Sequence, residues 1–460
     1  MHTGPGIKKS SNKLKRLFDK KKGRSSDHPF VIKFKSYRNL FNKIKKRAKQ
    51  EHYKTVFTNY HKDIKNTWRQ INLLLGKSKN KNNCSPYFKI GDRVIYDKKE
   101  IGNEFCKYLS SVGSDLADKI TPPGTDYKSY LNGNYTNSFY LCPTDADEVE
   151  KVVFNIKTKH SSGDDDISSF IVKHIQQFIC SPLATIFNKS FEEGVFPDDF
   201  KISRVVPIYK SKEAHNFNNY RPISLLPVFS KILEKLVHKR LYSYLSKQNI
   251  LYDGQYGFRK SMSTVDALTE FYGKVVETID KGDNMLAVFL DLSKAFDTLP
   301  WDKLLFKLNH YGIRGVSQAW FHSYLSNRNM YVLFNGFKSD TLPVTCGVPQ
   351  GSVLGPLLFI LYVNDLHRAV LNSATIQFAD DSTLFKSGKC NKLLFSQVNE
   401  ELQQLCIWFK ANTLSLNALK SHYVLFRGKR KKFDDEYTLS IDNVIIQRCK
   451  CVSFFRHEIR

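Results

Sequence analysis

Apolar residues in the second half of the chain recur with the period of helices. Residues 227–246 and 394–409 carry apolar side chains three to four positions apart, the spacing of one helix face. A third helix is predicted between Pro300, near its start, and Gly312, past its end. Residues 353–363 are apolar all round, which indicates a fully buried helix. These segments predict a helical layer around a common core.

Short apolar runs between these helices predict strands. Residues 285–290 have the pattern of a buried strand, and residues 423–426 follow the same pattern. Residues 374–378 and 382–386 predict the two arms of a hairpin. Strands and hairpins interspersed with helices favour an α+β fold, with a palm-like sheet backed by helices.

The positive charge of the chain is concentrated near the N-terminus. The net charge is +27, of which residues 1–60 carry +15, residues 61–100 carry +6, and the remaining 360 residues carry +6. A basic arm of this kind suggests a polyanionic partner, most often nucleic acid. The alternative is a solvated tail without a specific partner. Residues 1–28 are predicted to be disordered, and residues 29–80 to contain one or two basic helices.

The cysteines and the apolar segments limit the compartment. Nine cysteines are scattered without a Cys-x-x-Cys pair, which argues against a disulfide framework and a zinc site. The basic N-terminus lacks the apolar segment of a signal peptide. Residues 353–363 are too short to span a bilayer. We therefore expect an intracellular protein, nuclear or cytoplasmic, without a membrane partner.

Paired carboxylates are the strongest candidates for chemistry. Asp380 and Asp381 interrupt an apolar, strand-like run, and a buried strand does not accept unpaired charges. We therefore expect the pair at a tight turn. Asp291 ends the predicted strand 285–290, and side-by-side strands would bring the three carboxylates to one divalent-cation site. Taken separately, Asp291 has the alternative role of a helix N-cap, and an Asp-Asp pair is common on surface turns.

Several further motifs follow one another in a fixed order. They are residues 159–164, 194–197, 205–210, 219–224, 255–259, 291–297, 347–356, 378–381 and 417–420. With these motifs the chain resembles the reverse transcriptase of a LINE-type (non-LTR) retrotransposon, of the Jockey-like branch. The resemblance runs from about Lys159 to about Phe426, with Phe378 standing where the family usually has Tyr.

The resemblance implies a right-hand polymerase with fingers and palm. By composition, residues 1–28 are predicted to be a disordered basic tail and 29–150 a basic helical linker region; the resemblance implies a connector to the fingers over 151–200 and the reverse transcriptase domain over 201–460. Val452 begins the segment where the family has its primer-grip hairpin, and Phe455 and Arg456 depart from the family pattern there. We expect a truncated or missing thumb, hence a fragment of a polyprotein with poor processivity.

The resemblance also assigns catalytic residues. Asp291 and Asp380 match the two main metal ligands, and Asp381 matches a third, less direct carboxylate. They would hold two Mg²⁺ ions, with Mn²⁺ as the alternative, for phosphoryl transfer to a primer 3′-hydroxyl. Lys420 matches a residue proposed as the general acid toward pyrophosphate.

Nucleotide contacts are implied for five residues. Lys210 and Arg221 match finger residues that hold the triphosphate, and Arg can bind phosphate bidentately. Gln350 and Gly351 match a loop that packs on the incoming nucleotide, where glycine allows close backbone approach. Phe296 matches the gate that leaves no room for a ribose 2′-hydroxyl; the alternative is a core Phe.

Template contacts are implied for Gln255, Phe258 and Arg259. The expected partners are an RNA template, a DNA primer and deoxynucleoside triphosphates, and the sequence identifies no protein partner. The predicted function is RNA-directed DNA polymerase. The rival is a non-catalytic RNA- or DNA-binding remnant, and a third alternative is a product that does not fold stably.

Overall fold

The structure is a computed structural model that consists of two compact units, Met1–Asn83 and Cys84–Arg460. Side chains and backbone are described for most of residues 5–60, 63–75, 85–428 and 437–449, and the backbone alone for 452–454 and 457–459. Within these ranges, no helix combines the length and the apolar character needed to cross a membrane.

The N-terminal unit is helical. It contains α1 (Pro5–Lys21), α2 (Pro29–Asn59) and α3 (Ile64–Leu74). Helices α1 and α2 pack through buried apolar side chains, among them Leu17 and Phe34, and the Phe18 and Phe34 rings lie 5.8 Å apart. The sequence predicts disorder over residues 1–28, whereas the structure has α1 there. Contacts of Leu17 and Phe18 attach this lysine-rich helix to α2.

A five-stranded sheet, here called the central sheet, carries the predicted carboxylates. Its strand order is β14 (Gln447–Arg448), β11 (His422–Phe426), β5 (Asn284–Leu290), β10 (Asp381–Gly388) and β9 (Ala374–Phe378). Strand β5 lies in the middle and is antiparallel to both β10 and β11. This arrangement confirms the predicted strand at 285–290 and the predicted hairpin.

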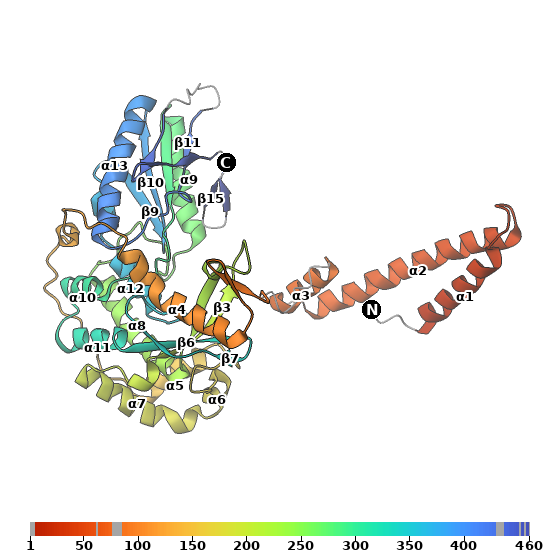
Figure 1. Cartoon of the computed structure of the whole chain (residues 1–460), viewed down its shortest axis with the longest axis horizontal. Coiled ribbons are helices and arrows are strands. Elements are labelled where there is room, and N and C mark those ends of the chain that lie inside the picture. The colour runs from red at the N-terminus through yellow and green to blue at the C-terminus, as the bar shows by residue number, and fades with distance from the viewer. Residues whose placement is uncertain are drawn as a thin grey trace. The chain divides into compact units, whose positions relative to one another are not determined.

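The two faces of the central sheet pack against different helices (Figure 1). On β5, Leu286 and Val288 join the large core that includes α13 (Asn391–Ala411), whereas Met285 and Ala287 pack with α9 (Thr264–Asp280). Alternate side chains of a strand point to opposite faces. Because both faces are covered, residues 285–290 of β5 are all apolar rather than apolar at every second position.

A second sheet forms the other layer of the larger unit. It has the order β4 (Tyr220–Leu225), β3 (Ile202–Tyr209), β6 (Arg328–Phe334) and β7 (Phe337–Lys338), and β8 (Leu342–Val344) also pairs with β6. Strands β3 and β4 form an antiparallel hairpin, and β3 and β6 are parallel.

Helices and short strands complete the larger unit. They are β1 (Phe88–Ile90), β2 (Arg93–Ile95), α4 (Lys98–Ala117), η1 (Tyr127–Tyr130), α5 (Ala146–Asn155), α6 (Ser169–His174), α7 (Gln176–Glu193), η2 (Asp198–Phe200), η3 (Phe217–Asn219), α8 (Val228–Lys247), α10 (Trp301–His310), α11 (Gly315–Leu325), α12 (Gly355–Tyr362), η4 (Leu366–Ala369), β12 (Ser440–Ile441), β13 (Val444–Ile445), β15 (Val452–Phe454) and β16 (His457–Ile459). Helix α12 is buried along its whole length, as the sequence predicts.

Residues 85–117 belong to the core of this unit, in contrast to the predicted linker over 29–150. Phe88 and Phe105 are fully buried and pack with Tyr220 of β4 and Phe334 of β6. The boundary between the units therefore lies in the tract 76–84, which is the linker by composition but falls outside the described residues. Residues 85–117 carry five basic and five acidic residues, so this segment does not share the positive charge of the region before it.

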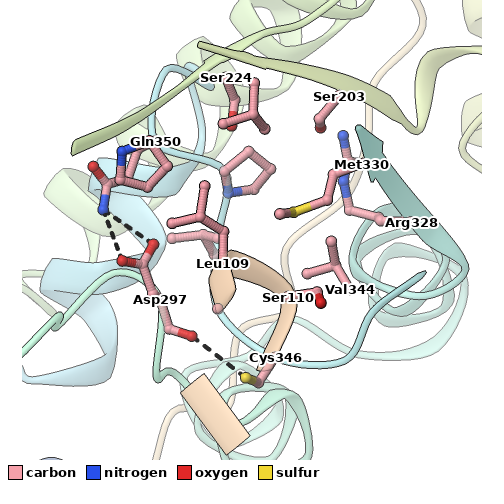
Figure 2. A pocket seen from close by; sticks show the side chains of 15 residues that line it. Leu109, Ser110, Ser203, Ser224, Asp297, Arg328, Met330, Val344, Cys346 and Gln350 are labelled. Atoms are coloured by element: carbon pink, nitrogen blue, oxygen red, sulfur yellow. Dashed lines mark hydrogen bonds between the residues drawn. The ribbon is translucent and has the colours of Figure 1, made fainter. Parts of the chain in front are cut away.

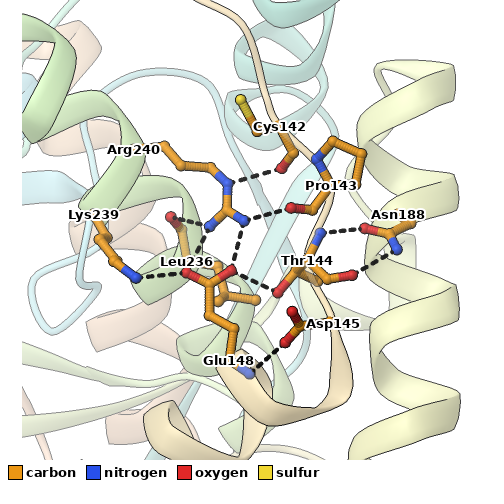
Figure 3. A network of polar contacts seen from close by, with 9 residues as sticks. All are labelled: Cys142, Pro143, Thr144, Asp145, Glu148, Asn188, Leu236, Lys239 and Arg240. Carbon is orange, nitrogen blue, oxygen red and sulfur yellow. Dashed lines mark hydrogen bonds and ion pairs between the residues drawn. The ribbon is translucent and has the colours of Figure 1, made fainter.

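A polar network centred on the half-buried Glu148 and Arg240 attaches the segment before α5 to α8 (Figure 3). The guanidinium of Arg240 donates to the carbonyl oxygens of Cys142 and Pro143 at 2.8 and 2.9 Å, and to Glu148 Oε2 at 2.6 Å. Lys239 Nζ donates to Glu148 Oε1 at 2.7 Å. Burial would raise the pKa of Glu148, but these bonds outweigh it and lower the pKa to about 2.

Candidate active site

The tip of the β9–β10 hairpin holds the paired carboxylates. Phe378 pairs with Asp381, so that Ala379 and Asp380 form a two-residue turn. Ala379 has a φ of 60°, a conformation that favours glycine and is found in such tight hairpins. The predicted turn is confirmed, and Asp381 is the first residue of β10 rather than part of the turn.

Asp291 follows β5 directly and lies beside this hairpin. In the register of the two strands, Leu290 pairs with Ser382. The backbone N–H of Asp291 donates to Ser421 Oγ at 3.2 Å, and its carbonyl oxygen accepts from the Asn417 N–H at 2.9 Å. Lys420 Nζ lies 3.3 Å from Asp291 Oδ2. Residues 417–421 therefore hold the backbone and the side chain of Asp291 at the end of β5.

The three carboxylates interact electrostatically. Burial raises the pKa of Asp381 to about 6, and the charges of Asp380 and Asp291 add to this. Burial also raises the pKa of Asp380; Asp291 raises it further, and Lys210 and Arg221 lower it. The charge of each carboxylate thus affects the pKa of its neighbours, and the charges of Lys210 and Arg221 affect the pKa of Asp380 as well.

The carboxylates do not form a closed cage. Among the described residues, no three His, Cys, Asp or Glu side chains surround a single metal-sized point. Mg²⁺ is usually held by one or two carboxylates and completes its octahedron with water and substrate phosphates. The hard oxygen donors of Asp291 and Asp380 fit this chemistry.

Phe296 contacts one core ring and one exposed ring. Its half-buried ring packs on Phe359 of α12, with 4.7 Å between ring centroids, and meets Phe258 edge-on at 6.2 Å. The contact with Phe359 agrees with the alternative prediction, that Phe296 is a core residue. The gate role of Phe296 stays a prediction.

The loop before α12 is fixed on both sides (Figure 2). Gln350 Nε2 donates to Asp297 Oδ1 and Oδ2, and the Gln350 carbonyl oxygen accepts from the Ser224 N–H at 2.8 Å. Gly351 has a φ of 131°, and a Cβ there would lie 2.5 Å from the Ser224 carbonyl oxygen. Only glycine allows the loop to approach β4 so closely.

Two buried carboxylates that support this loop were missed from the sequence. Burial raises the pKa of Asp297 to about 6. Glu234 of α8 is fully buried, and its Oε2 accepts from the backbone N–H groups of Val353 and Leu354 at 2.6 and 3.0 Å. Asp297 stands six residues after Asp291, which was an available signal. Nothing in the sequence marks Glu234 as a support of this loop, because the two loop N–H groups that it accepts from lie about 120 positions further along the chain.

The predicted template residues lie in different environments. Gln255 is 1% exposed, whereas Phe258 is 47% exposed with a φ of 56°. Arg259 Nη1 donates to the carbonyl oxygens of Tyr252 and Gln255 at 2.8 and 3.3 Å. Because Gln255 is buried, its side chain cannot touch a template. The Arg259 side chain binds backbone carbonyl oxygens of the loop that precedes it. Phe258 remains the accessible member of this group.

The predicted primer-grip segment is described by its backbone alone. Strands β15 and β16 pair as an antiparallel hairpin, with Val452 opposite Ile459. Phe455 and Arg456, which depart from the family pattern, lie outside the described residues.

Comparison with known families decides the identity of this site. The family described as reverse transcriptase (RNA-dependent DNA polymerase) matches residues 208–452, more than half of the chain. The chain belongs to the reverse transcriptase family. The match includes β4 with Arg221 and the whole β9–β10 hairpin with Asp380, and the reverse transcriptase family implies a palm and fingers.

Relatives of this reverse transcriptase come from mobile elements. The probable RNA-directed DNA polymerase from transposon BS of Drosophila melanogaster is 29% identical over 345 residues, which cover 72% of the chain and 37% of the relative. The RNA-directed DNA polymerase from mobile element jockey of the same species is 27% identical over 310 residues, 66% of the chain and 34% of the relative. The predicted resemblance to Jockey-like elements is confirmed. The chain spans about a third of the length of these relatives.

Proposed function

We propose that the chain catalyses template-directed addition of deoxynucleotides to a primer 3′-end on an RNA template. The observation that carries this proposal is the register of β5 beside β10, which brings Asp291 next to the turn of Asp380 and Asp381. Three carboxylates on two adjacent strand ends match the needs of phosphoryl transfer, in which divalent ions activate the 3′-hydroxyl and neutralise the phosphates.

Asp291 and Asp380 are the proposed ligands of two Mg²⁺ ions, and Mn²⁺ is the alternative ion. Asp381 acts as the outer carboxylate, because its raised pKa reflects burial and two negative neighbours. A bound cation would remove this repulsion and bring both pKa values down. Lys420, at 3.3 Å from Asp291, is placed to carry a proton toward departing pyrophosphate.

The remaining residues are proposed to position the nucleotide. Arg221 is exposed on β4, and its charge and that of Lys210 already act on Asp380, so both can reach triphosphate oxygens near this carboxylate. The Phe296 ring, supported from below by Phe359, would exclude a 2′-hydroxyl. Gln350, held by Asp297, would present the backbone of its loop to the nucleotide.

Primer extension on poly(rA)·oligo(dT) with Mg²⁺ tests the proposal. Asp380→Asn removes the charge at the turn and changes little packing, so it should abolish extension while the protein stays folded. Glu150→Gln, the same carboxylate-to-amide change at an exposed position of α5, serves as the control and should extend like the wild type. Extension by Asp380→Asn at the wild-type rate would contradict the metal assignment.

A second candidate function follows from the basic helices of the N-terminal unit. Residues 1–60 carry a net charge of +15, and α1 and α2 have no acidic residue in their first turns. A folded wild-type chain that binds RNA in a salt-dependent way, yet extends no primer, would be a nucleic-acid-binding protein with an inactive polymerase site.

A further inference from the structure

The loop Gly254–Gly257 lies along the open edge of the central sheet. Strand β9 is the edge strand, and its Gln377 N–H donates to the Gly254 carbonyl oxygen at 2.8 Å. In return, the Tyr256 N–H donates to the Gln377 carbonyl oxygen at 2.8 Å. The loop thus adds a short parallel bridge, Gln255 to Gln377, next to the turn that carries the carboxylates.

The side chain of Gln255 reaches into this turn. Its Oε1 accepts from the Ala379 N–H at 3.0 Å and from the Gly257 N–H at 2.8 Å. Its Nε2 donates to Gln377 Oε1 at 3.2 Å. Both glutamines are buried, and Ala379 directly precedes Asp380. The buried amide oxygen of Gln255 therefore holds the backbone of Ala379, the residue directly before Asp380.

Gly257 shows how closely the loop approaches the turn. A Cβ at this position would lie 2.1 Å from the Ala379 nitrogen and 2.9 Å from the Phe378 carbonyl carbon. Both atoms belong to the backbone and cannot move aside without moving the hairpin. Any side chain here would push the loop away from the turn.

We propose that Gln255 is a positioning residue of the polymerase reaction, and that its amide oxygen holds the Ala379 N–H so that Asp380 keeps its place. This inference rests on the proposed polymerase function. The next residues of the same segment extend the link, because the ring of Phe258 meets that of Phe296. The segment thus connects the catalytic turn with the wall of the nucleotide site.

A positioning role predicts a specific kinetic result. An unheld turn lets Asp380 move, and a misplacement of about 1 Å at a reacting centre costs roughly 100-fold in rate. Affinity for primer–template should stay the same, because Gln255 has no exposed surface with which to touch it. A template contact would give the opposite pattern.

The test uses the full chain and three variants. Gln255→Met keeps the length of the side chain and removes the amide, whereas Gln255→Glu keeps an oxygen acceptor for Ala379. Asn188→Ala is the matched control: the Asn188 amide also makes two bonds to a backbone, with the N–H and carbonyl of Thr144 at 2.7 and 2.9 Å (Figure 3). Hydrogen–deuterium exchange of the peptide covering residues 374–388 is measured beside primer extension and primer–template binding.

In Gln255→Met, we expect the turn to exchange roughly tenfold faster, kcat to fall about 10- to 100-fold, and primer–template Kd to stay unchanged. Gln255→Glu should restore slow exchange, and Asn188→Ala should leave the exchange of this peptide unchanged. Unchanged exchange in Gln255→Met, or a raised Kd with unchanged kcat, would overturn the positioning role. If the wild type extends no primer, the proposed function fails, while exchange still decides whether Gln255 holds the turn.

Discussion

Gln350 Nε2 donates to both carboxylate oxygens of Asp297, at 3.0 Å to Oδ1 and 3.1 Å to Oδ2. Asp297 follows the proposed gate residue Phe296 directly, so one carboxylate connects this residue with the loop that is proposed to face the nucleotide. The loop is held from its other side by Glu234 and Ser224. Polar contacts within the protein therefore support the segments that are proposed to line the nucleotide site.

The first prediction concerns the charge of Asp297. Burial raises its pKa to about 6 in the folded state, against about 3.9 in the unfolded chain. The folded state therefore binds the proton more tightly, and the free energy of unfolding falls as pH rises from about 4 to about 6. The loss is at most about 3 kcal/mol. Asp297→Asn has no such step and should gain stability relative to the wild type at pH 7.

Denaturant unfolding of both proteins at pH 4 and pH 7 measures this difference. Other titrating groups are common to the two proteins and cancel in the comparison. A difference in unfolding free energy that is the same at both pH values would contradict the raised pKa of Asp297.

The second prediction separates the loop support of Glu234 from ordinary stability. Glu234→Leu leaves the N–H groups of Val353 and Leu354 without their acceptor, which should cost about 1–3 kcal/mol for each unsatisfied group. Glu401→Leu is a matched control, because Glu401 is also buried and accepts from two consecutive N–H groups, those of Leu371 and Asn372.

Both variants should lower the melting temperature, but only Glu234→Leu should raise the KM for deoxynucleotide. Steady-state primer extension well below both melting temperatures measures this. Equal KM values in the two variants would show that Glu234 has no role beyond stability.

The third prediction concerns Gly351. Gly351→Ala places a Cβ 2.5 Å from the Ser224 carbonyl oxygen and requires an unfavourable φ, which should cost at least about 1–3 kcal/mol. Gly273→Ala in α9 meets open space and should stabilise the protein by roughly 0.5–1 kcal/mol. Thermal unfolding compares the two alanine variants. Opposite shifts are expected, and a neutral Gly351→Ala would contradict the close approach.

The fourth prediction concerns the choice of sugar. Phe296→Ala should admit ribonucleotides, because the ring that fills the space of the 2′-hydroxyl is lost. Phe296→Tyr keeps the ring and should keep the discrimination. The measurement is the ratio of kcat/KM for dTTP and UTP on poly(rA)·oligo(dT). An unchanged ratio in Phe296→Ala would remove the gate role.

The sequence predicts those parts of the fold that local pattern determines. Residues 285–290 of β5 and helix α12 are apolar because they are covered on all sides, and the turn of Asp380 is marked by charge within an apolar run. Helix α1 was not predicted, because its contact with α2 depends on Leu17 and Phe18 among many lysines. The core role of residues 85–117 was missed because Phe88 and Phe105 pack with residues more than a hundred positions further along the chain.

The supporting residues of the site could not be found in this way. Glu234 and Gln255 are polar residues, and the site segments that they hold, at Val353 and Ala379, lie about 120 positions further along the chain. Their burial is a consequence of tertiary packing, and a single sequence gives no sign of it. The family resemblance implies a template contact for Gln255, whereas Gln255 is buried and its amide bonds to groups within the protein.

The most direct test of the account is primer extension by Asp291→Asn, Asp380→Asn and the double variant over a range of Mg²⁺ concentrations. Asp291 follows β5 and Asp380 lies in the β9–β10 turn, and both are proposed to bind metal in one site. Each single variant should therefore lose extension almost completely, and the double variant should lose little more, because residues that act as a unit are not additive. Independent, additive losses, or wild-type extension by either single variant, would contradict a shared metal site.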